Sequence, residues 1–488
     1  MKLLRSPFTW CATTYFAEGF PYSLVRQISS VYFKDHNASL PAIGMTSLYG
    51  LPWALKFLWA PYLDRYGTKR KWILILEGLL CFVILAFAGM SQTAVALTAG
   101  AFLFMLIAFV AATHDIAIDG YYLEALDRKG QAKFVGYRVM AYRLALIAGA
   151  GGVITLSHFF GWPAAMGAAA LVLFLLLLYH AFFLPTAEKE TLPLRGLLSD
   201  RGGRRIAGIG LAGLLFAVVL FLGRHWPPLG RLLLPFEPLG RILSPAGWIS
   251  LSLFTALLVL LALRKRIRER FLGSDSFYAN AFLTFLDQKR IGWALAFIVL
   301  YRTGESLLAA MTAPFLLDLG INKAQYGLLS GTFGILFSIL GALAGGACIA
   351  RYSLSKTIWP FTLAQNLTNV VYMAMAYFYR GLFLQEGAAR EVSLLFVGAV
   401  HCFDQFAGGL GTAVFSFYLM RCCRPEFKAS HFAIVSGIMS VGGIVFGITS
   451  GFLASWLGYW RFFGLSFFAS IPGMCLIAFI PFLKEEQA

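Results

Sequence analysis

Apolar segments of about 20 residues recur from one end of the chain to the other, and they constrain the fold more than any other feature. A helix of roughly this length crosses the hydrocarbon core of a bilayer, which is about 30 Å thick. Only 13% of the 488 residues are charged, about half the fraction usual in soluble domains. We therefore predict an all-α membrane protein. Its polar stretches are too short to form a separate soluble domain.

The apolar segments predict fourteen membrane spans, arranged as two sets of six with two extra spans between them. The predicted spans are 8–33, 40–62, 72–90, 95–125, 134–157, 162–184, 206–223, 247–263, 291–317, 324–350, 357–379, 391–420, 430–456 and 462–483. The predicted domains are an N-terminal six-helix half at 1–184, a linker with the two extra helices at 185–290, and a C-terminal six-helix half at 291–488.

Basic residues are concentrated in the short loops on one side of the predicted spans. If both termini lie inside, 27 Lys and Arg residues fall on the cytoplasmic side and 8 on the outer side. Cytoplasmic loops of membrane proteins carry such an excess, so both termini are predicted to be cytoplasmic. The same bias accounts for the net charge of +17 without a nucleic-acid partner. The seven cysteines show neither a zinc spacing nor a disulfide framework, so no metal site is predicted.

The two sets of six spans show signs of an internal repeat. Residues 63–70, after the second span, correspond to residues 349–356 at a constant offset of 286. Asp115 in the fourth span has a counterpart in Asp404, in the fourth span of the second set. Repeated halves in a membrane protein are typical of a transporter with its binding site between them.

Charged residues inside the predicted spans are the candidate site. Asp115 and Asp119 are four residues apart, so they share one face of a helix. An aspartate at the centre of a membrane helix costs about 2.5–3.5 kcal/mol, and this face must therefore look into protein or water. The full set of candidates for proton or substrate binding is Glu18, Lys56, His114, Asp115, Asp119, Arg143, Arg302, Glu305 and Asp404.

A carboxylate can load and release a proton where burial disfavours its charge and a nearby cation favours it. Asp115 and Asp119 could form such a system with Arg138 or Arg143 on the next span, or a structural ion pair that joins the two spans. His114 could titrate near neutral pH or serve as a packing residue.

The remaining intramembrane charges also leave two interpretations. Arg302 and Glu305, three residues apart, either neutralise each other or contact the substrate. Glu18 precedes Pro21, which should loosen the first helix. Glu77, in the third span, is interpreted as close enough to the cytoplasmic end to reach the surface.

The segment Asp64-Arg65-Tyr66-Gly67-Thr68-Lys69-Arg70-Lys71 resembles the D-R-x-G-x-[RK] loop that follows the second span in the major facilitator superfamily. The resemblance implies a fold of two six-helix halves around a cavity lined by spans one, two, four and five of each half. It also implies a cytoplasmic gating motif, for which the candidates are Asp64, Arg65, Gly67 and Arg70.

A narrower resemblance rests on residues 54–61, 114–119 and 408–413, which look like those of AmpG-type muropeptide permeases. These permeases are related to acetyl-coenzyme A transporters and to some siderophore permeases. Glutamine is common before the first aspartate in that family, and this chain has His114 there. The two extra spans also fit this family.

The AmpG-type resemblance implies a bacterial inner-membrane transporter that imports anhydromuropeptides with protons. The expected partners are a small anionic solute and membrane lipid, with protons as the coupling ion and no other cofactor. A transporter of acetyl-coenzyme A or a siderophore with the same fold is the alternative, and a non-transporting membrane sensor is a further one. No Ser/His/Asp group and no metal-ligand spacing indicates an enzyme.

Overall fold

The computed structural model describes residues 3–56, 59–186, 192–193, 269, 283–381, 392–424 and 428–483, nearly all of them helical. The helices before residue 190 are α1 (Pro7–Ser23), α2 (Ser29–Asp35), α3 (Leu40–Gly44), α4 (Leu51–Leu55), α5 (Ala60–Arg65), α6 (Lys69–Met90), α7 (Ala96–Ala125), α8 (Arg128–Ile147) and α9 (Ile154–Phe183). The later ones are α17 (Ile291–Leu300), α18 (Thr303–Asp318), α19 (Lys323–Tyr326), α20 (Ile335–Tyr352), α21 (Leu354–Phe378), α23 (Leu394–Arg421), α24 (Lys428–Leu457) and α25 (Tyr459–Leu476).

Helices occupy all twelve predicted spans that fall within the described residues. Seven of the described helical segments are long and apolar enough to cross a membrane by length and composition alone. The predicted spans 206–223 and 247–263 lie outside the described residues. The all-helical membrane fold is thus confirmed, and the count of fourteen spans stays a prediction.

The contacts divide the chain into two units whose bounds differ from those of the predicted domains. Unit 1 comprises Met1–Tyr32 and Leu55–Ser244, and unit 2 comprises Phe33–Ala54 and Pro245–Ala488. Helix α3 therefore packs with the second unit, against α24. The predicted domain boundaries at 184 and 291 stay a prediction.

Glycines explain how closely α3 and α24 approach within unit 2. A Cβ atom added to Gly44 would lie 2.9 Å from the carbonyl oxygen of Ile448. A Cβ on Gly451 would meet the carbonyl oxygen of Leu40. The absence of a side chain at these positions allows backbone-to-backbone packing, as is common in membrane helices.

The repeat predicted from the sequence recurs in the backbone geometry. Gly67 has φ +68° and Ser353, 286 residues later, has φ 72°. Each residue joins two helices, α5 to α6 and α20 to α21. A second pair of similar turns occurs at Gly161 (φ 76°) and Gly458 (φ 72°). Positive φ is uncommon for a residue other than glycine, so Ser353 adopts a conformation that the turn itself requires.

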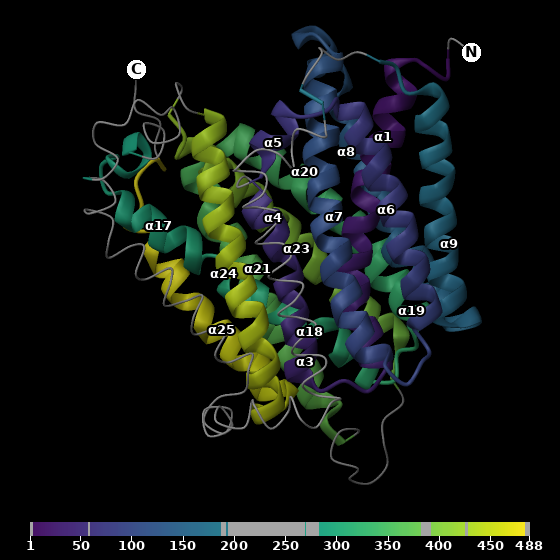
Figure 1. The fold of residues 1–488 in the computed structure, drawn as a ribbon. Coiled ribbons are helices and arrows are strands. Elements are labelled where there is room, and N and C mark those ends of the chain that lie inside the picture. Colours follow the sequence, from purple (N-terminus) through teal and green to yellow (C-terminus); the bar gives the residue numbers. More distant parts are fainter. Residues whose placement is uncertain are drawn as a thin grey trace. The chain divides into compact units, whose positions relative to one another are not determined.

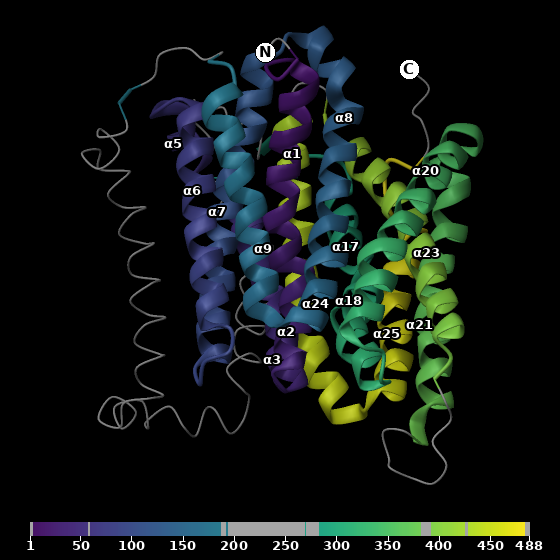
Figure 2. The same cartoon turned by 90° about the vertical axis from the view of Figure 1, so that its right-hand side faces the viewer.

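Unit 1 is built around α1, α6, α7, α8 and α9, which run side by side in both ribbon views (Figures 1 and 2). Helix α1 contains Pro21 and continues into a π-helical turn at Leu24–Ile28, which confirms the expected irregularity after Glu18. A Cβ on Gly19 would lie 2.8 Å from the carbonyl oxygen of Tyr142 on α8. This close approach brings the charged residues of α1 toward those of α7 and α8.

Small residues also bring the helices of unit 2 together. A Cβ on Gly409 would meet the carbonyl oxygen of Ser338, so α23 lies directly on α20. Tyr301 stacks on Phe415 with ring centroids 4.5 Å apart, inside a buried apolar cluster of this unit. The packing places the following residues, Arg302 and Glu305, beside α21 and α23.

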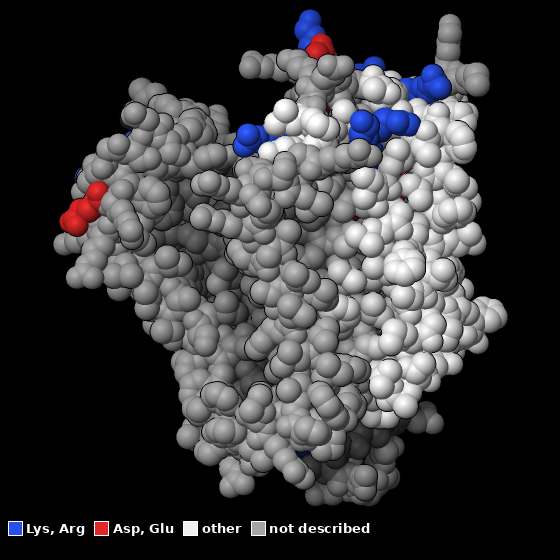
Figure 3. All heavy atoms as spheres, in the orientation of Figure 1, with Lys and Arg blue, Asp and Glu red and all other residues white. Residues whose placement is uncertain are grey.

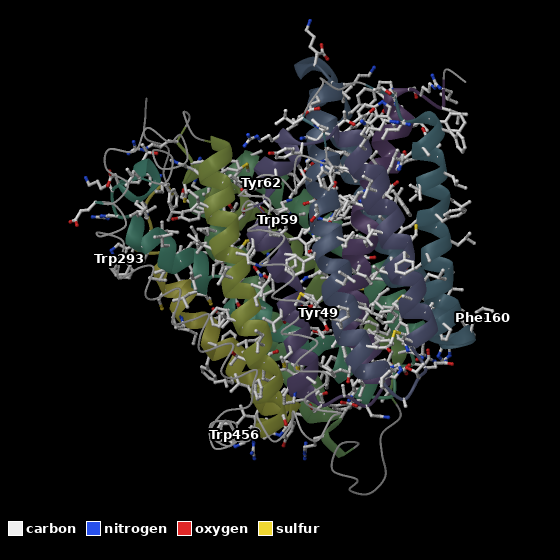
Figure 4. All side chains as sticks on the ribbon, in the orientation of Figure 1. Tyr49, Trp59, Tyr62, Phe160, Trp293 and Trp456 are labelled. Atoms are coloured by element: carbon white, nitrogen blue, oxygen red, sulfur yellow. The ribbon has the colours of Figure 1, made fainter. Side chains whose placement is uncertain are left out.

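The surfaces of both units are those expected next to lipid. Phe160 is 69% exposed and Trp456 80% exposed, and both project away from the helices (Figure 4). In unit 1, blue Lys and Arg side chains gather at the end where α1 begins, above a white surface (Figure 3). Exposed residues at this end of α1, α6 and α8 include Arg5, Lys71 and Lys129. The assignment of this end to the cytoplasm stays a prediction.

Candidate functional site

Unit 1 contains a cluster of opposite charges, here called the acidic cluster: Glu18, Lys56, Asp115, Asp119 and Arg138. Helix α1 supplies Glu18, α7 supplies both aspartates, α8 supplies Arg138, and Lys56 directly follows α4. Lys56 Nζ forms an ion pair with Asp115 Oδ2. The Asp115 side chain is only 10% exposed and the Lys56 side chain 33%. Spacing on α7 therefore placed the two aspartates correctly on one face, but Lys56 is the cation that pairs with the first of them.

Asp119 is held by a second set of contacts. The Tyr15 hydroxyl donates to Asp119 Oδ1 over 2.8 Å, and Arg138 donates to the Tyr15 hydroxyl over 2.9 Å. Arg138 Nη1 also lies 3.6 Å from Asp119 Oδ1. The guanidinium carbon lies 4.7 Å from the centre of the Tyr15 ring and 5.1 Å from that of Tyr122, within range for cation–π attraction. Of the two predicted arginines, Arg138 is the one that meets the carboxylates.

Glu18 completes the acidic cluster. Its Oε2 atom is buried and has no hydrogen-bond partner among the described residues. It interacts electrostatically with both Asp115 and Asp119. Three carboxylates therefore face two cations, and full ionisation would leave one excess negative charge beside the buried Glu18 Oε2 and the largely buried Asp115. Such a charge is costly unless it is neutralised.

His114 does not join the acidic cluster. It is completely buried on another side of α7, with Nε2 3.5 Å from Glu77 Oε1. Glu77 itself is completely buried and hydrogen-bonded to His180 Nδ1 over 2.7 Å. The interpretation of Glu77 as a side chain that reaches the membrane surface is therefore wrong. Histidines on two other helices, α7 and α9, lie beside its carboxylate inside unit 1.

Arg143 remains apart from the carboxylates. Its side chain is half-buried on α8, and the described residues offer no Asp or Glu within ion-pair distance of it. The neighbouring ring of Tyr142 lies 6.0 Å from that of Tyr22. A half-buried guanidinium without a carboxylate partner can receive an anionic group from a ligand.

Unit 2 contains a second group of polar side chains, here called the paired cluster: Arg302, Glu305, Gln365 and Asp404. Arg302 lies at the break between α17 and α18, with φ −96° and ψ 14°. Its Nε donates to Glu305 Oε2 over 2.7 Å, and its Nη2 donates to Oε1. Gln365 Nε2 also donates to Glu305 Oε2. Of the two interpretations of Arg302 and Glu305, mutual neutralisation is the one seen here.

Asp404 lies at the edge of the paired cluster and is 8% exposed. It accepts a hydrogen bond from Gln405 Nε2 over 3.2 Å, and it interacts electrostatically with Glu305. Among the described residues no Lys, Arg or His forms an ion pair with it. The nearby His401 is hydrogen-bonded to the Tyr372 hydroxyl over 2.8 Å. Asp404 and its counterpart Asp115 thus differ in the one feature that matters for charge, a cationic partner.

The predicted gating motif binds the end of a helix in its own unit. Arg70 donates to the carbonyl oxygens of Leu184 (3.0 Å) and Ala181 (2.7 Å) at the end of α9. The Gly67 amide donates to the carbonyl of Leu192 over 2.8 Å. Arg65 is exposed, and the side chain of Asp64 lies outside the described part of the structure. Basic side chains are favourable at a helix C-terminus, so Arg70 has a structural role here. A gating role stays a prediction.

Three partners of the site were not among the sequence candidates. Tyr15 precedes Glu18 by three residues on α1, so helical spacing alone could have found it. His180 and Gln365 carry no such signal, because both meet their carboxylates across different helices.

Charged side chains enclosed by apolar membrane helices are common in transport proteins, and the comparisons with known proteins point to the same class. Residues 11–195 match the family model of the Major Facilitator Superfamily. In solved structures, the chain is similar to a peptide transporter POT in complex with sulfate, with a TM-score of 0.67 and 13% identity, covering 97% of this chain and 94% of that one. It is also similar to a mutant of the nucleoside transporter NupG, with a TM-score of 0.54 and 12% identity, over 96% and 99% of the two chains.

The relatives found by sequence point to a narrower group of transporters than the solved structures do. An anhydromuropeptide permease of Escherichia coli K12 is 26% identical over 95% of this chain and 77% of its own length. An uncharacterized protein of Haemophilus influenzae is 27% identical over 98% and 95%. The predicted resemblance to the major facilitator superfamily and its AmpG-type permeases is thereby confirmed. The protein is a multi-pass membrane transporter rather than an enzyme, with AmpG-like relatives, a match to the Major Facilitator Superfamily model over residues 11–195, and the fold of peptide transporters.

Proposed function

We propose that this protein imports peptidoglycan-derived anhydromuropeptides together with protons across the bacterial inner membrane, with both termini in the cytoplasm. The observation that carries the coupling is the charge balance of the acidic cluster. Three carboxylates face two cations, and a buried oxygen of Glu18 has no hydrogen-bond partner among the described residues. One bound proton brings this cluster to neutrality.

A coupling site must also release its proton. Lys56 and Arg138 lie beside the carboxylates, and a nearby cation stabilises the charged form of an acid. A movement that brings a cation closer to the protonated carboxylate therefore expels the proton, and a movement that separates them draws one in. The acidic cluster contains both components of such an exchange.

The proposed substrate class rests on the relatives and on the cations. A relative is named for anhydromuropeptide transport, and muropeptides carry several carboxylates beside sugar rings. Lys56 and Arg302 already have carboxylate partners, whereas Arg143 has none among the described residues. We assign Arg143 as the residue that receives a substrate carboxylate.

Acetyl-coenzyme A or a ferric siderophore is the alternative substrate. Phosphates of coenzyme A would also suit a guanidinium, so charge alone does not separate the two classes. Competition does. Purified protein in liposomes, with a pH gradient imposed, is tested for uptake of labelled GlcNAc-anhydro-MurNAc in the presence of each unlabelled candidate.

The expected result is that excess anhydromuropeptide blocks uptake and the other two solutes do not. Arg143→Gln should raise the KM for the muropeptide about tenfold or more, since a charge-assisted hydrogen bond contributes about 1.5–3 kcal/mol. Arg461→Gln is the matched control, because Arg461 is exposed and its guanidinium lies over the ring of Trp460. If only coenzyme A esters or siderophores compete, the muropeptide assignment is wrong.

A further inference from the structure

A second group of titratable side chains lies inside unit 1, and the transport mechanism above does not use it. Glu77 on α6, His114 on α7 and His180 on α9 are each completely buried. Glu77 is eight residues from the start of its helix, roughly 12 Å along the axis. The group, here called the histidine cluster, therefore lies well inside the helix bundle.

Both ring nitrogens of His180 lie within hydrogen-bonding distance of an oxygen. Its Nε2 lies 3.1 Å from the Thr13 hydroxyl oxygen of α1. The same hydroxyl oxygen lies 3.1 Å from the carbonyl oxygen of Thr9 and 3.3 Å from that of Trp10. On the other side of the ring, Nδ1 lies 2.7 Å from the Glu77 carboxylate. An imidazole that donates from both nitrogens is an imidazolium, and oxygens that can accept lie beside both nitrogens of His180, so the site can hold that form.

The histidine cluster also has unused hydrogen-bonding capacity. Glu77 Oε2 and both ring nitrogens of His114 have no hydrogen-bond partner among the described residues. A purely structural network in a protein interior is normally fully satisfied. His114 Nε2 lies 3.5 Å from the same Glu77 oxygen that binds His180, so it offers a second position for the proton.

The surroundings do not supply another cation. The other titratable groups nearby are Cys81 on α6, which interacts electrostatically with Glu77, and Tyr179 on α9, whose hydroxyl donates to the carbonyl oxygen of Leu4. Helix α1 contributes only the Thr13 hydroxyl. Among the described residues no Lys or Arg forms an ion pair with Glu77. The charge of Glu77 is therefore compensated by the proton on a histidine.

From this geometry we propose that the histidine cluster is a second proton-binding site, which holds one proton between His180, Glu77 and His114. We further propose that it is linked to the acidic cluster, because His114 directly precedes Asp115 on α7. This linkage rests on the proposed proton coupling. A change in charge on one side of α7 alters the cost of the opposite change on the other side.

The proton is detected directly by NMR of histidine-labelled (¹⁵N) protein in lipid. The chain has 7 histidines, and the signal that His180→Gln removes belongs to His180. At neutral pH this signal should be that of a doubly protonated ring, and Glu77→Gln should convert it to a neutral ring. Neutral rings at both His180 and His114 in the unaltered protein overturn the proposal. Should His180→Gln fail to fold, His114→Gln removes the signal of His114 and leaves that of His180 in place.

The linkage is tested by the pH profile of uptake in liposomes. The double variant Glu77→Gln, His180→Gln replaces the charged pair by amides that still hydrogen-bond. This double variant should change the proton concentration that gives half-maximal uptake by at least about fivefold. Coupling between two binding sites usually changes an affinity by at least this factor. His158→Gln is the control, since His158 is exposed and lies on α9 like His180. It should leave the pH profile unchanged.

The outcomes separate this inference from the proposed function. One outcome is a doubly protonated His180 in the parent protein together with an unchanged pH profile in the double variant. The histidine cluster would then bind its proton without affecting transport, and the linkage would be overturned. If the parent protein shows no uptake driven by a pH gradient, the proposed function fails. The NMR signal of His180 still decides whether the second proton is bound.

Discussion

The acidic cluster of unit 1 and the paired cluster of unit 2 use similar residues in different ways. In unit 1, Glu18 and the two aspartates share Lys56 and Arg138, and every carboxylate interacts with a cation or with another carboxylate. In unit 2, Arg302 is bound through two nitrogens to Glu305. Asp404 lies beside this pair and accepts a hydrogen bond from the Gln405 amide.

The difference shows why carboxylates at corresponding places in a repeat need not have the same role. Loading and release of a proton require an environment that can favour either form of the acid. Asp115 has a lysine partner whose approach favours the charged form. Asp404 has no such partner among the described residues, and Glu305 is occupied by its arginine. Proton exchange is therefore assigned to unit 1 in our proposal.

The largest effect is expected from Asp115→Asn. The amide has nearly the same volume but cannot carry a negative charge, so Lys56 loses its counter-charge and the cluster no longer requires a proton. Accumulation driven by a pH gradient should fall to background, while exchange of labelled for unlabelled solute at equal pH persists. Glu124→Gln, on the exposed part of the same helix, serves as the control. If the Asp115→Asn variant still accumulates the solute with the normal dependence on pH, this residue has no part in the mechanism.

An intermediate effect is expected from Glu305→Gln in the paired cluster. Arg302 would lose its carboxylate, and since the two side chains are 30% and 21% exposed, the loss of stability should be about 1–2 kcal/mol, between values for exposed and buried pairs. Thermal unfolding in detergent should show a lower Tm. Proton-driven accumulation should continue at a reduced rate. Loss of coupling with an unchanged Tm would contradict the division of roles between the two clusters.

The smallest effect is expected from Asp404→Asn. The asparagine retains an oxygen that accepts from Gln405 and adds no charge, so both stability and coupling should stay close to those of the parent protein. Uptake at several imposed pH gradients provides the measurement. A complete loss of accumulation here, with folded protein in the membrane, would move the coupling proton to unit 2.

Much of the fold could be predicted because lipid imposes a strong pattern on sequence. Each apolar segment of about 20 residues must satisfy its backbone as a helix, and all the described predicted spans are helical. The offset of 286 between Gly67 and Ser353 likewise appears in both sequence and backbone. Spacing on one helix also found the shared face of Asp115 and Asp119.

Contacts between helices could not be predicted in the same way. Sequence spacing gives the face of a helix on which a residue lies but not the helix opposite that face. It therefore does not show that His180 lies 2.7 Å from Glu77, and it predicts Glu77 at the membrane surface instead. For the same reason Lys56 was not recognised as the partner of Asp115. The membership of Phe33–Ala54 in unit 2 also depends on packing, in particular on close contacts at Gly44 and Gly451.

The central claim is that the excess negative charge of the acidic cluster is neutralised by one proton. Infrared difference spectroscopy of the protein in lipid measures this directly, because a protonated carboxylic acid has a carbonyl stretch that a carboxylate lacks. We predict a band that appears and disappears with pH in the parent protein, is absent in Glu18→Gln, and persists in Glu305→Gln. A titrating band that is unchanged in Glu18→Gln, or one that is lost in Glu305→Gln, would contradict the account.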